Sequence, residues 1–119
     1  NISSAISTLE NKKNIYLILG GIAKEDGFNK FNKFRKHIDR IYIYGKSRLK
    51  IKNQINLLDI SIIKKNLKEV INTIWKDLSD KNFKITIVFA PACASFDQFD
   101  NFEKRGAYFN QLIQNKLTK

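Results

Sequence analysis

Continuous apolar runs that end at glycines alternate along this chain with segments of helical periodicity. The first run covers residues 14–19 and stops at Gly20 and Gly21, and a second run over 40–44 stops at Gly45. Apolar runs without polar alternation are typical of strands that are buried on both faces, as in parallel sheets. The alternation therefore predicts an α/β fold, a Rossmann-like three-layer domain with a mostly parallel sheet flanked by helices.

The remaining elements are predicted from hydrophobic spacing and from turn residues. The longest predicted helix begins at Asp59 or Ser61, and Trp75 is taken as a core residue with the phenylalanines at helical spacing. The core face of this helix is expected to comprise Ile63, Leu67, Val70, Ile71, Ile74 and Leu78. We expect helices at 3–10, 28–38, 48–54, 60–79 and 101–116, and strands at 14–19, 40–44, 56–58 and 84–90.

Length and cysteine content limit how the chain is organised. Its 119 residues suit one domain, 1–119, whose core needs neither a disulfide nor a metal. One cysteine, Cys93, and one histidine, His37, form neither a zinc pattern nor an internal disulfide, so no metal site is expected. Because no apolar run is long enough to span a bilayer, we expect a cytoplasmic protein with no membrane partner, and we expect it to be a monomer.

The net charge of +11 allows two interpretations. A free-standing basic α/β module that binds nucleic acid or another anionic partner is one of them. The other is a solvated lysine surface, since the lysines are spread over most of the predicted helices and occur with many asparagines and isoleucines, as an AT-rich coding sequence produces. No aromatic-basic motif for single-stranded nucleic acid is present, so we expect no nucleic-acid partner and keep the basic module as the alternative.

Two segments at the carboxyl ends of predicted strands indicate a binding site. The segment from Pro91 to Phe102 contains small residues and Ser95, and it leads into a predicted helix. Ligands of open α/β sheets bind at such strand ends, where a hydroxyl and free backbone N–H groups can hold an anion. The other segment follows Gly20 and brings in Lys24, which can pair with a carboxylate or a phosphate.

Each of these residues also has a purely structural interpretation. Lys24 can be a solvated loop lysine, and Ser95 can be a turn or helix-entry serine. A catalytic triad is not expected because His37 lies at the end of a distant predicted helix. Cys93 has no neighbouring base in sequence to lower its pKa and suits a small buried position. The residues therefore favour binding, and no catalytic residue is expected within this domain.

Several stretches together resemble one protein family over essentially the whole chain. The block 91–106 is its most specific part, whereas the glycine–lysine segment alone is weak. The resemblance is to the C-terminal domain of the Mur ligases that add D-glutamate, and it is carried by Leu17 to Gly21 with Lys24, Ile43 to Gly45, Phe89 to Phe99 and Asn101 to Gly106.

This resemblance implies a three-domain ligase that joins D-glutamate to UDP-N-acetylmuramoyl-L-alanine in peptidoglycan synthesis. It implies that ATP and Mg²⁺ are bound mainly by the central domain, and that the central ATP-binding and N-terminal UDP-binding domains are absent from these 119 residues. Asn1 resembles the last residue of a Ser-Lys-Ala-Thr-Asn segment at the entry to this domain. We therefore expect a piece of a longer polypeptide that is inactive alone.

The resemblance also implies which residues hold D-glutamate. Lys24 matches a lysine that pairs with one carboxylate of the amino acid, and Ser95 matches a serine that hydrogen-bonds the distal carboxylate. The Phe96 backbone is expected beside Ser95, although the family often has leucine at this position. Phe102 matches a phenylalanine that packs near the same end. The expected D-glutamate site is therefore Lys24, Ser95, Phe96 and Phe102.

Overall fold

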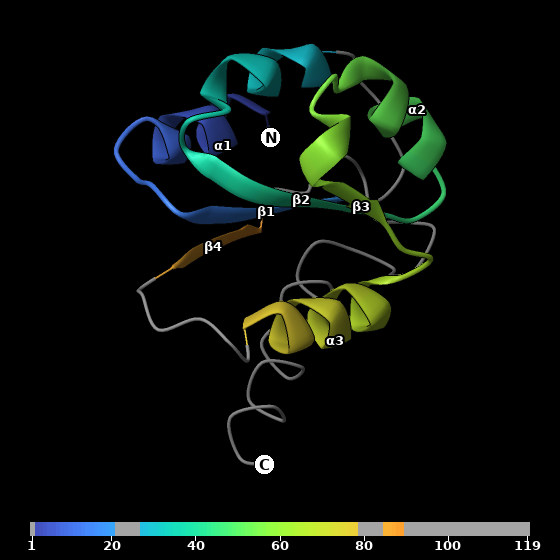
Figure 1. Ribbon diagram of the computed structural model, residues 1–119. Helices are drawn as coiled ribbons and strands as arrows, with labels where there is room; N and C mark the ends of the chain where they lie inside the picture. The colour runs from blue at the N-terminus through green and yellow to red at the C-terminus, as the bar shows by residue number, and fades with distance from the viewer. Residues whose placement is uncertain (1, 21–26, 79–84, 90–119) are drawn as a thin grey trace.

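A computed structural model describes residues 2–20, 27–78 and 85–89, which form a parallel sheet between helices (Figure 1). Two of the helical segments, η1 and η2, are 3-10 helices. Along the described part of the chain the elements are α1 (Ile2–Leu9), β1 (Ile15–Gly20), η1 (Phe28–Phe34), β2 (Ile38–Tyr44), α2 (Arg48–Gln54), η2 (Leu58–Ile60), β3 (Ser61–Ile63), α3 (Leu67–Leu78) and β4 (Thr86–Phe89).

The sheet has four described strands in the order β3-β2-β1-β4, and every pair of neighbours is parallel. β1 is central and pairs with β2 on one side and with β4 on the other. Parallel neighbours require crossover connections, which the helices between the strands supply. The predicted α/β class with a mostly parallel sheet is confirmed.

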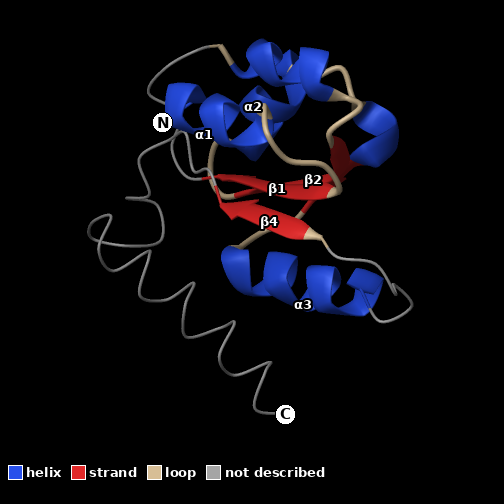
Figure 2. Cartoon of the chain, turned by 90° about the vertical axis from the view of Figure 1, so that its left-hand side faces the viewer, coloured by secondary structure: helices blue, strands red, loops and turns tan. Residues whose placement is uncertain are grey.

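Successive side chains of β1 enter two different cores. Leu17 and Leu19 lie in the core shared with α1, η1 and α2, whereas Tyr16 and Ile18 lie in the core covered by α3. Figure 2 shows the same layering, with α1 and α2 on one face of the sheet and α3 on the other. All six residues of β1 are buried, as a strand covered on both faces requires, and the three-layer arrangement is confirmed.

The prediction was wrong about the segment between α2 and α3. The third strand is Ser61–Ile63 rather than 56–58, and the long helix begins at Leu67 rather than near residue 60. The spacing of the three isoleucines here suits the buried start of a helix and a short strand equally well. It therefore could not distinguish a helix from a strand at Ile60, Ile62 and Ile63. Tertiary pairing with β2 makes 61–63 a strand.

Reciprocal side-chain capping sets where α3 begins. Oδ1 of Asn66 accepts a hydrogen bond of 2.9 Å from the Glu69 backbone N–H, and Oε2 of Glu69 accepts one of 2.9 Å from the Lys65 N–H. These bonds satisfy backbone donors around a helix start that no intrahelical carbonyl can reach. Asn66 therefore caps the start of α3 and marks the boundary between β3 and α3.

Two further expectations are corrected by the packing. Residues 28–34 form a 3-10 helix that ends before β2 begins at Ile38, so Ile38 opens a strand instead of closing a helix. Trp75, expected in the core, is 37% exposed. It lies one residue beyond Ile74, which packs on the sheet, and thus at the margin of the apolar stripe of α3. The predicted helix at 101–116 lies outside the described residues.

Candidate functional site

The carboxyl ends of β1 and β4 lie side by side at one edge of the sheet. β4 pairs with β1 from Thr86 opposite Ile15 to Phe89 opposite Ile18, and β1 continues to Gly20. In sequence, Lys24 follows the end of β1 by four residues and Ser95 follows the end of β4 by six. The two segments predicted to bind an anion therefore leave neighbouring parallel strands at the same edge.

The four predicted D-glutamate residues themselves lie outside the described part of the chain. Lys24 belongs to 21–26, and Ser95, Phe96 and Phe102 belong to 90–119. Their roles stay predictions. The described residues determine where the segments that carry them start and, for 21–26, where that segment ends.

Gly20 is a glycine because Tyr44 fills the space that a side chain would need. A Cβ built on Gly20 would lie 2.2 Å from Cε1 of Tyr44, well inside any permitted contact. The Tyr44 ring belongs to the core under α3 and is 1% exposed, so it has little room to move. This close approach fixes the end of β1 against β2, directly before the segment that carries Lys24.

A glutamine and an asparagine hold the other end of that segment. Oε1 of Gln54 accepts hydrogen bonds from the backbone N–H groups of Gly27, at 3.1 Å, and Phe28, at 3.0 Å. Nδ2 of Asn32 donates to the backbone oxygen of Gln54 at 3.2 Å, and Oδ1 of Asn32 accepts from the Asn56 N–H at 3.0 Å. The start of η1 is thereby bound to the end of α2.

Sequence reasoning missed both of these polar residues. Gln54 lies 27 residues from Gly27, and no local motif links a glutamine at a helix end to a distant glycine. The local signal in the sequence was the glycine at position 27 itself. Its φ is 108°, in the left-handed region that favours glycine. Gln54 and Asn32 hold the start of η1 against the end of α2, and neither is among the predicted D-glutamate residues.

Basic residues border the carboxyl end of β2. Arg48 donates from Nη1 to the backbone oxygen of Gly45 at 2.8 Å, and the Gly45 N–H donates to the Lys65 oxygen at 3.3 Å. Lys46 and Lys64 follow the ends of β2 and β3. Lys46, Lys64 and Lys65 on two adjoining turns, with Arg48 at the start of α2, raise the local potential, which favours anionic ligands at this edge.

Tyrosines rather than acids occupy the middle of the core under α3. The Tyr42 hydroxyl donates a 2.7 Å hydrogen bond to Oδ2 of Asp77, and the rings of Tyr42 and Tyr16 are 6.0 Å apart. Burial, followed by the bond to Asp77, raises the pKa of Tyr42 well above its usual range, and burial also raises the pKa of Tyr16. Both phenols stay protonated at neutral pH and are structural.

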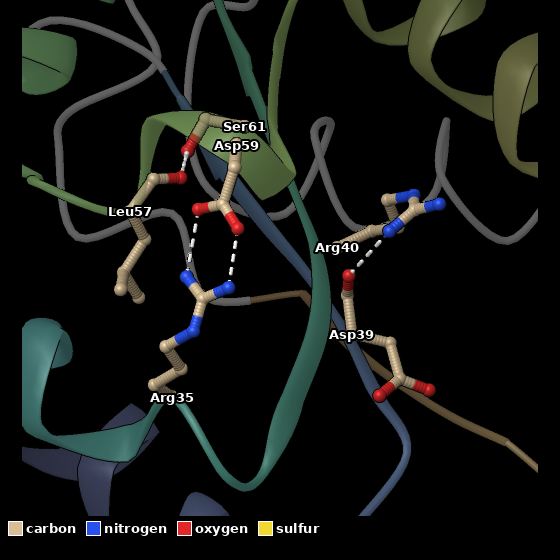
Figure 3. A network of polar contacts seen from close by, with 6 residues as sticks. All are labelled: Arg35, Asp39, Arg40, Leu57, Asp59 and Ser61. Atoms are coloured by element: carbon tan, nitrogen blue, oxygen red, sulfur yellow. Dashed lines mark hydrogen bonds and ion pairs between the residues drawn. The ribbon is translucent and has the colours of Figure 1, made fainter.

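The opposite, amino edge of the sheet carries a separate polar network, drawn in Figure 3. Arg35, before β2, forms a bidentate pair with Asp59, before β3, in which Nη1 donates to Oδ1 at 2.7 Å. The hydrogen bond to Asp59 raises the pKa of Arg35, and the bond from Arg35 lowers the pKa of Asp59. Ser61 Oγ donates to the Leu57 oxygen at 2.7 Å. These contacts hold the entries to β2 and β3.

The single histidine also lies at the amino edge. His37 directly precedes β2, its Nδ1 lies 2.8 Å from the Lys12 oxygen, and its ring packs edge-on against Phe34. The predicted ligand segments leave the sheet at the other edge. The absence of a Ser95–His37 catalytic pair stays a prediction, because Ser95 is outside the described residues.

The described part of the chain contains neither a metal-binding cluster nor a membrane-spanning helix. Across 2–20, 27–78 and 85–89, no three histidine, cysteine or acidic residues lie close enough to bind a metal ion. Within the same ranges, no helix combines the length and the apolar composition needed to cross a bilayer.

The described residues form a parallel α/β domain, and the basic side chains at the carboxyl edge of its sheet favour anionic ligands. Comparison with known proteins shows what this domain is similar to. Over 114 residues the chain is 37% identical to the UDP-N-acetylmuramoylalanine–D-glutamate ligase of Rickettsia conorii, with 94% of the chain covered. The ligases of a Hydrogenobaculum species and of Francisella philomiragia are 34% and 31% identical, over 95% and 92% of the chain. No family model matches the chain.

These similarities confirm the resemblance to the D-glutamate-adding Mur ligases over nearly the whole of this chain. The chain spans only 23–27% of the length of these three relatives. The chain therefore corresponds to about a quarter of such a ligase.

Proposed function

We propose that this chain is the C-terminal, D-glutamate-binding domain of an ATP-dependent ligase that acts in peptidoglycan synthesis. The ligase joins D-glutamate to UDP-N-acetylmuramoyl-L-alanine in the cytoplasm and works as a monomer. One observation carries the proposal: in a chain related to D-glutamate ligases, the two segments predicted to bind carboxylates leave the adjacent parallel strands β1 and β4 at one edge.

The proposed role of the domain is to hold both carboxylates of D-glutamate. Lys24 pairs with one carboxylate, while the Ser95 hydroxyl and the Phe96 backbone N–H donate to the distal one, against the Phe102 ring. Two fixed carboxylates leave the amino group in one orientation toward the activated acyl carbon of the nucleotide substrate. Such positioning is a large part of what a ligase supplies to a two-substrate reaction.

Other parts of the enzyme are proposed to carry the remaining chemistry. The described residues do not fit a Mg²⁺ site, because no three acidic, histidine or cysteine side chains gather among them. As the resemblance implies, ATP and Mg²⁺ are assigned mainly to the central domain and the UDP moiety to the N-terminal domain, and this domain closes over the central ATP site. The chain alone is expected to be inactive and to bind D-glutamate weakly.

Kinetics of the complete ligase test this proposal. Lys24→Ala removes a charge-assisted contact, so the KM for D-glutamate is expected to rise roughly tenfold or more. Lys36→Ala, which removes an exposed lysine just before β2 at the opposite edge, is the matched control and should leave this KM unchanged. An unaltered KM and turnover in Lys24→Ala would refute the role of Lys24.

The alternative function, a free-standing basic module, is tested with the chain alone. It requires salt-dependent binding of short oligonucleotides by the monomeric domain. An open reading frame that continues upstream of Asn1 through a Gly-Lys-Thr phosphate-binding loop favours the ligase instead.

A further inference from the structure

We propose that the exposed face of α2, together with the turns after β2 and β3, is a docking surface for a separate protein that presents an acidic segment with an apolar side chain. α2 lies on the face of the sheet opposite α3 (Figure 1). The residues that form this surface all belong to the described part of the chain, and the inference does not depend on the roles proposed for Lys24 and Ser95.

An apolar side chain, that of Leu49, stands in solvent at the centre of this face. Leu49 is 63% exposed, whereas Ile51, two residues further along α2, is buried in the core on this side of the sheet. At 3.6 residues per turn, positions two residues apart lie on nearly opposite sides of a helix, so Leu49 faces away from that core. Single exposed leucines are common on protein surfaces, and the surroundings of Leu49 therefore decide whether it has a role.

Cations surround Leu49, and the chain supplies no acid between them. Residues 46–58 contain four basic residues and no acidic one, and the four are Lys46, Arg48, Lys50 and Lys52. Helical spacing places Arg48 and Lys52 on one side of the leucine and Lys50 on the other. Arg48 is held near the turn after β2 by its 2.8 Å hydrogen bond to the Gly45 oxygen. The leucine thus has positive charge on both sides.

The turn after β3 adds positive charge beside this face. The Gly45 N–H donates to the Lys65 oxygen at 3.3 Å, and the Lys64 N–H donates to the Ile43 oxygen at 2.8 Å, so this turn is bound to the end of β2. Glu69, whose Oε2 accepts the Lys65 N–H, brings one negative charge to the same border. With two lysines against one glutamate, this border remains positive.

The chemistry of the surface favours an acidic protein segment over other occupants. A second copy of the chain would present the same positive charge and be repelled. Residues 46–58 include no aromatic side chain that could stack on a nucleic-acid base. One leucine on a seven-residue helix offers little apolar area for insertion into a bilayer. Carboxylates flanking one apolar residue complement both the leucine and its cations.

Two short glutamate-rich peptides of equal charge, one with a central leucine and one with a central serine, test the surface by NMR titration of the chain. Leu49→Gln removes the apolar side chain and keeps a good helix former. Leu58→Gln is its matched control, because Leu58 is 60% exposed but is followed by Asp59. Lys50→Glu reverses a charge beside Leu49, and Lys13→Glu, at an exposed position between α1 and β1, is the control for it.

We expect the leucine peptide to bind about tenfold more tightly than the serine peptide and to shift the amides of α2 and of the turns after β2 and β3. Leu49→Gln should abolish this difference in affinity, and Lys50→Glu should weaken the binding of both peptides. Leu58→Gln and Lys13→Glu should change neither affinity. Equal affinities of the two peptides for the parent chain, or amide shifts centred on another surface, would overturn the proposal.

The other occupants are tested with the same variants. Tighter binding of a short oligonucleotide or of phosphatidylserine vesicles than of the leucine peptide would overturn the choice of partner, as would self-association that Leu49→Gln abolishes. The complete ligase should bind the leucine peptide as tightly as the chain does. If the peptide binds only the chain, the surface is covered within the ligase, and a separate partner is excluded.

Discussion

The hydroxyl of Tyr42 donates a 2.7 Å hydrogen bond to Oδ2 of Asp77 and so connects the middle of β2 to the last turn of α3. This bond fixes the helix along the sheet within the core that Tyr16, Ile18 and Tyr44 form with the apolar face of α3. A directional contact of this kind sets the register of a helix that hydrophobic packing alone leaves less well defined.

Removing this hydroxyl is expected to lower stability. Tyr42→Phe keeps the ring, loses the bond and leaves a half-buried carboxylate without it, so the free energy of unfolding should fall by about 1 kcal/mol. Urea denaturation of the chain measures the change. Asp77→Asn, which retains an acceptor oxygen, is the control and should lose less. Equal stability of Tyr42→Phe and the parent would contradict this account.

The raised pKa of Tyr42 predicts a dependence on alkaline pH. The folded pKa lies above the unfolded value of 10.0, so the folded state keeps its proton where the unfolded state has lost it. The resulting stability is complete below pH 10.0 and is lost as the pH rises toward the folded pKa. Denaturation above pH 10.0 should show this fall, and Tyr42→Phe should reduce it. In Tyr42→Phe, part of the fall in stability at alkaline pH should remain, because the pKa of Tyr16 is also raised.

A methyl group on Gly20 is expected to disturb the fit against Tyr44. Gly20→Ala places a Cβ 2.2 Å from Cε1 of the buried ring, and overpacking of this kind costs roughly 1–3 kcal/mol. Tyr44→Leu removes the ring atoms involved. A double-mutant cycle in urea should therefore show the pair to be less destabilised than the sum of the single changes. Strict additivity would mean that the two residues do not compete for this space.

The start of α3 should depend on the cap formed by Asn66. Asn66→Ala removes the acceptor for the Glu69 N–H and should lower the free energy of unfolding by about 1 kcal/mol. Asn72→Ala, an exposed change within the same helix, serves as the control and should be neutral or stabilising because alanine favours helix. A similar loss in both variants would mean that the effect of Asn66→Ala does not come from the lost cap.

The Arg35–Asp59 pair should contribute only slightly to stability, because both side chains are more than half exposed. The lowered pKa of Asp59 means that its contribution is present above the unfolded value of 3.8 and is lost as the pH falls below it. Asp59→Asn should flatten this acid dependence and leave stability at neutral pH nearly unchanged. A large loss at neutral pH would show the pair to be a main constraint on the entry to β3.

Sequence patterns predicted the parts of this fold that local residues determine. The apolar run before Gly20 and the run before Gly45 both became central strands, and the short helix at Arg48–Gln54 matched its predicted bounds. The predicted start of the long helix near residue 60 was wrong because the three neighbouring isoleucines suit either a strand or a helix. Only pairing with β2 decides between the two.

The candidate site was predictable only in part for a similar reason. Strand ends and glycines indicated the edge, and the resemblance indicated Lys24 and Ser95. Gln54 was missed because its partner Gly27 is 27 residues away, and no spacing rule connects them. Likewise, the requirement for glycine at position 20 comes from the ring of Tyr44 on the next strand, 24 residues along the chain.

A crystal structure of the complete ligase with D-glutamate bound tests the central claim most directly. The account predicts one carboxylate of the amino acid within hydrogen-bond distance of Nζ of Lys24 and the distal carboxylate within the same distance of Oγ of Ser95, beyond the carboxyl ends of β1 and β4. D-glutamate bound away from this edge, with neither side chain in reach, would contradict it.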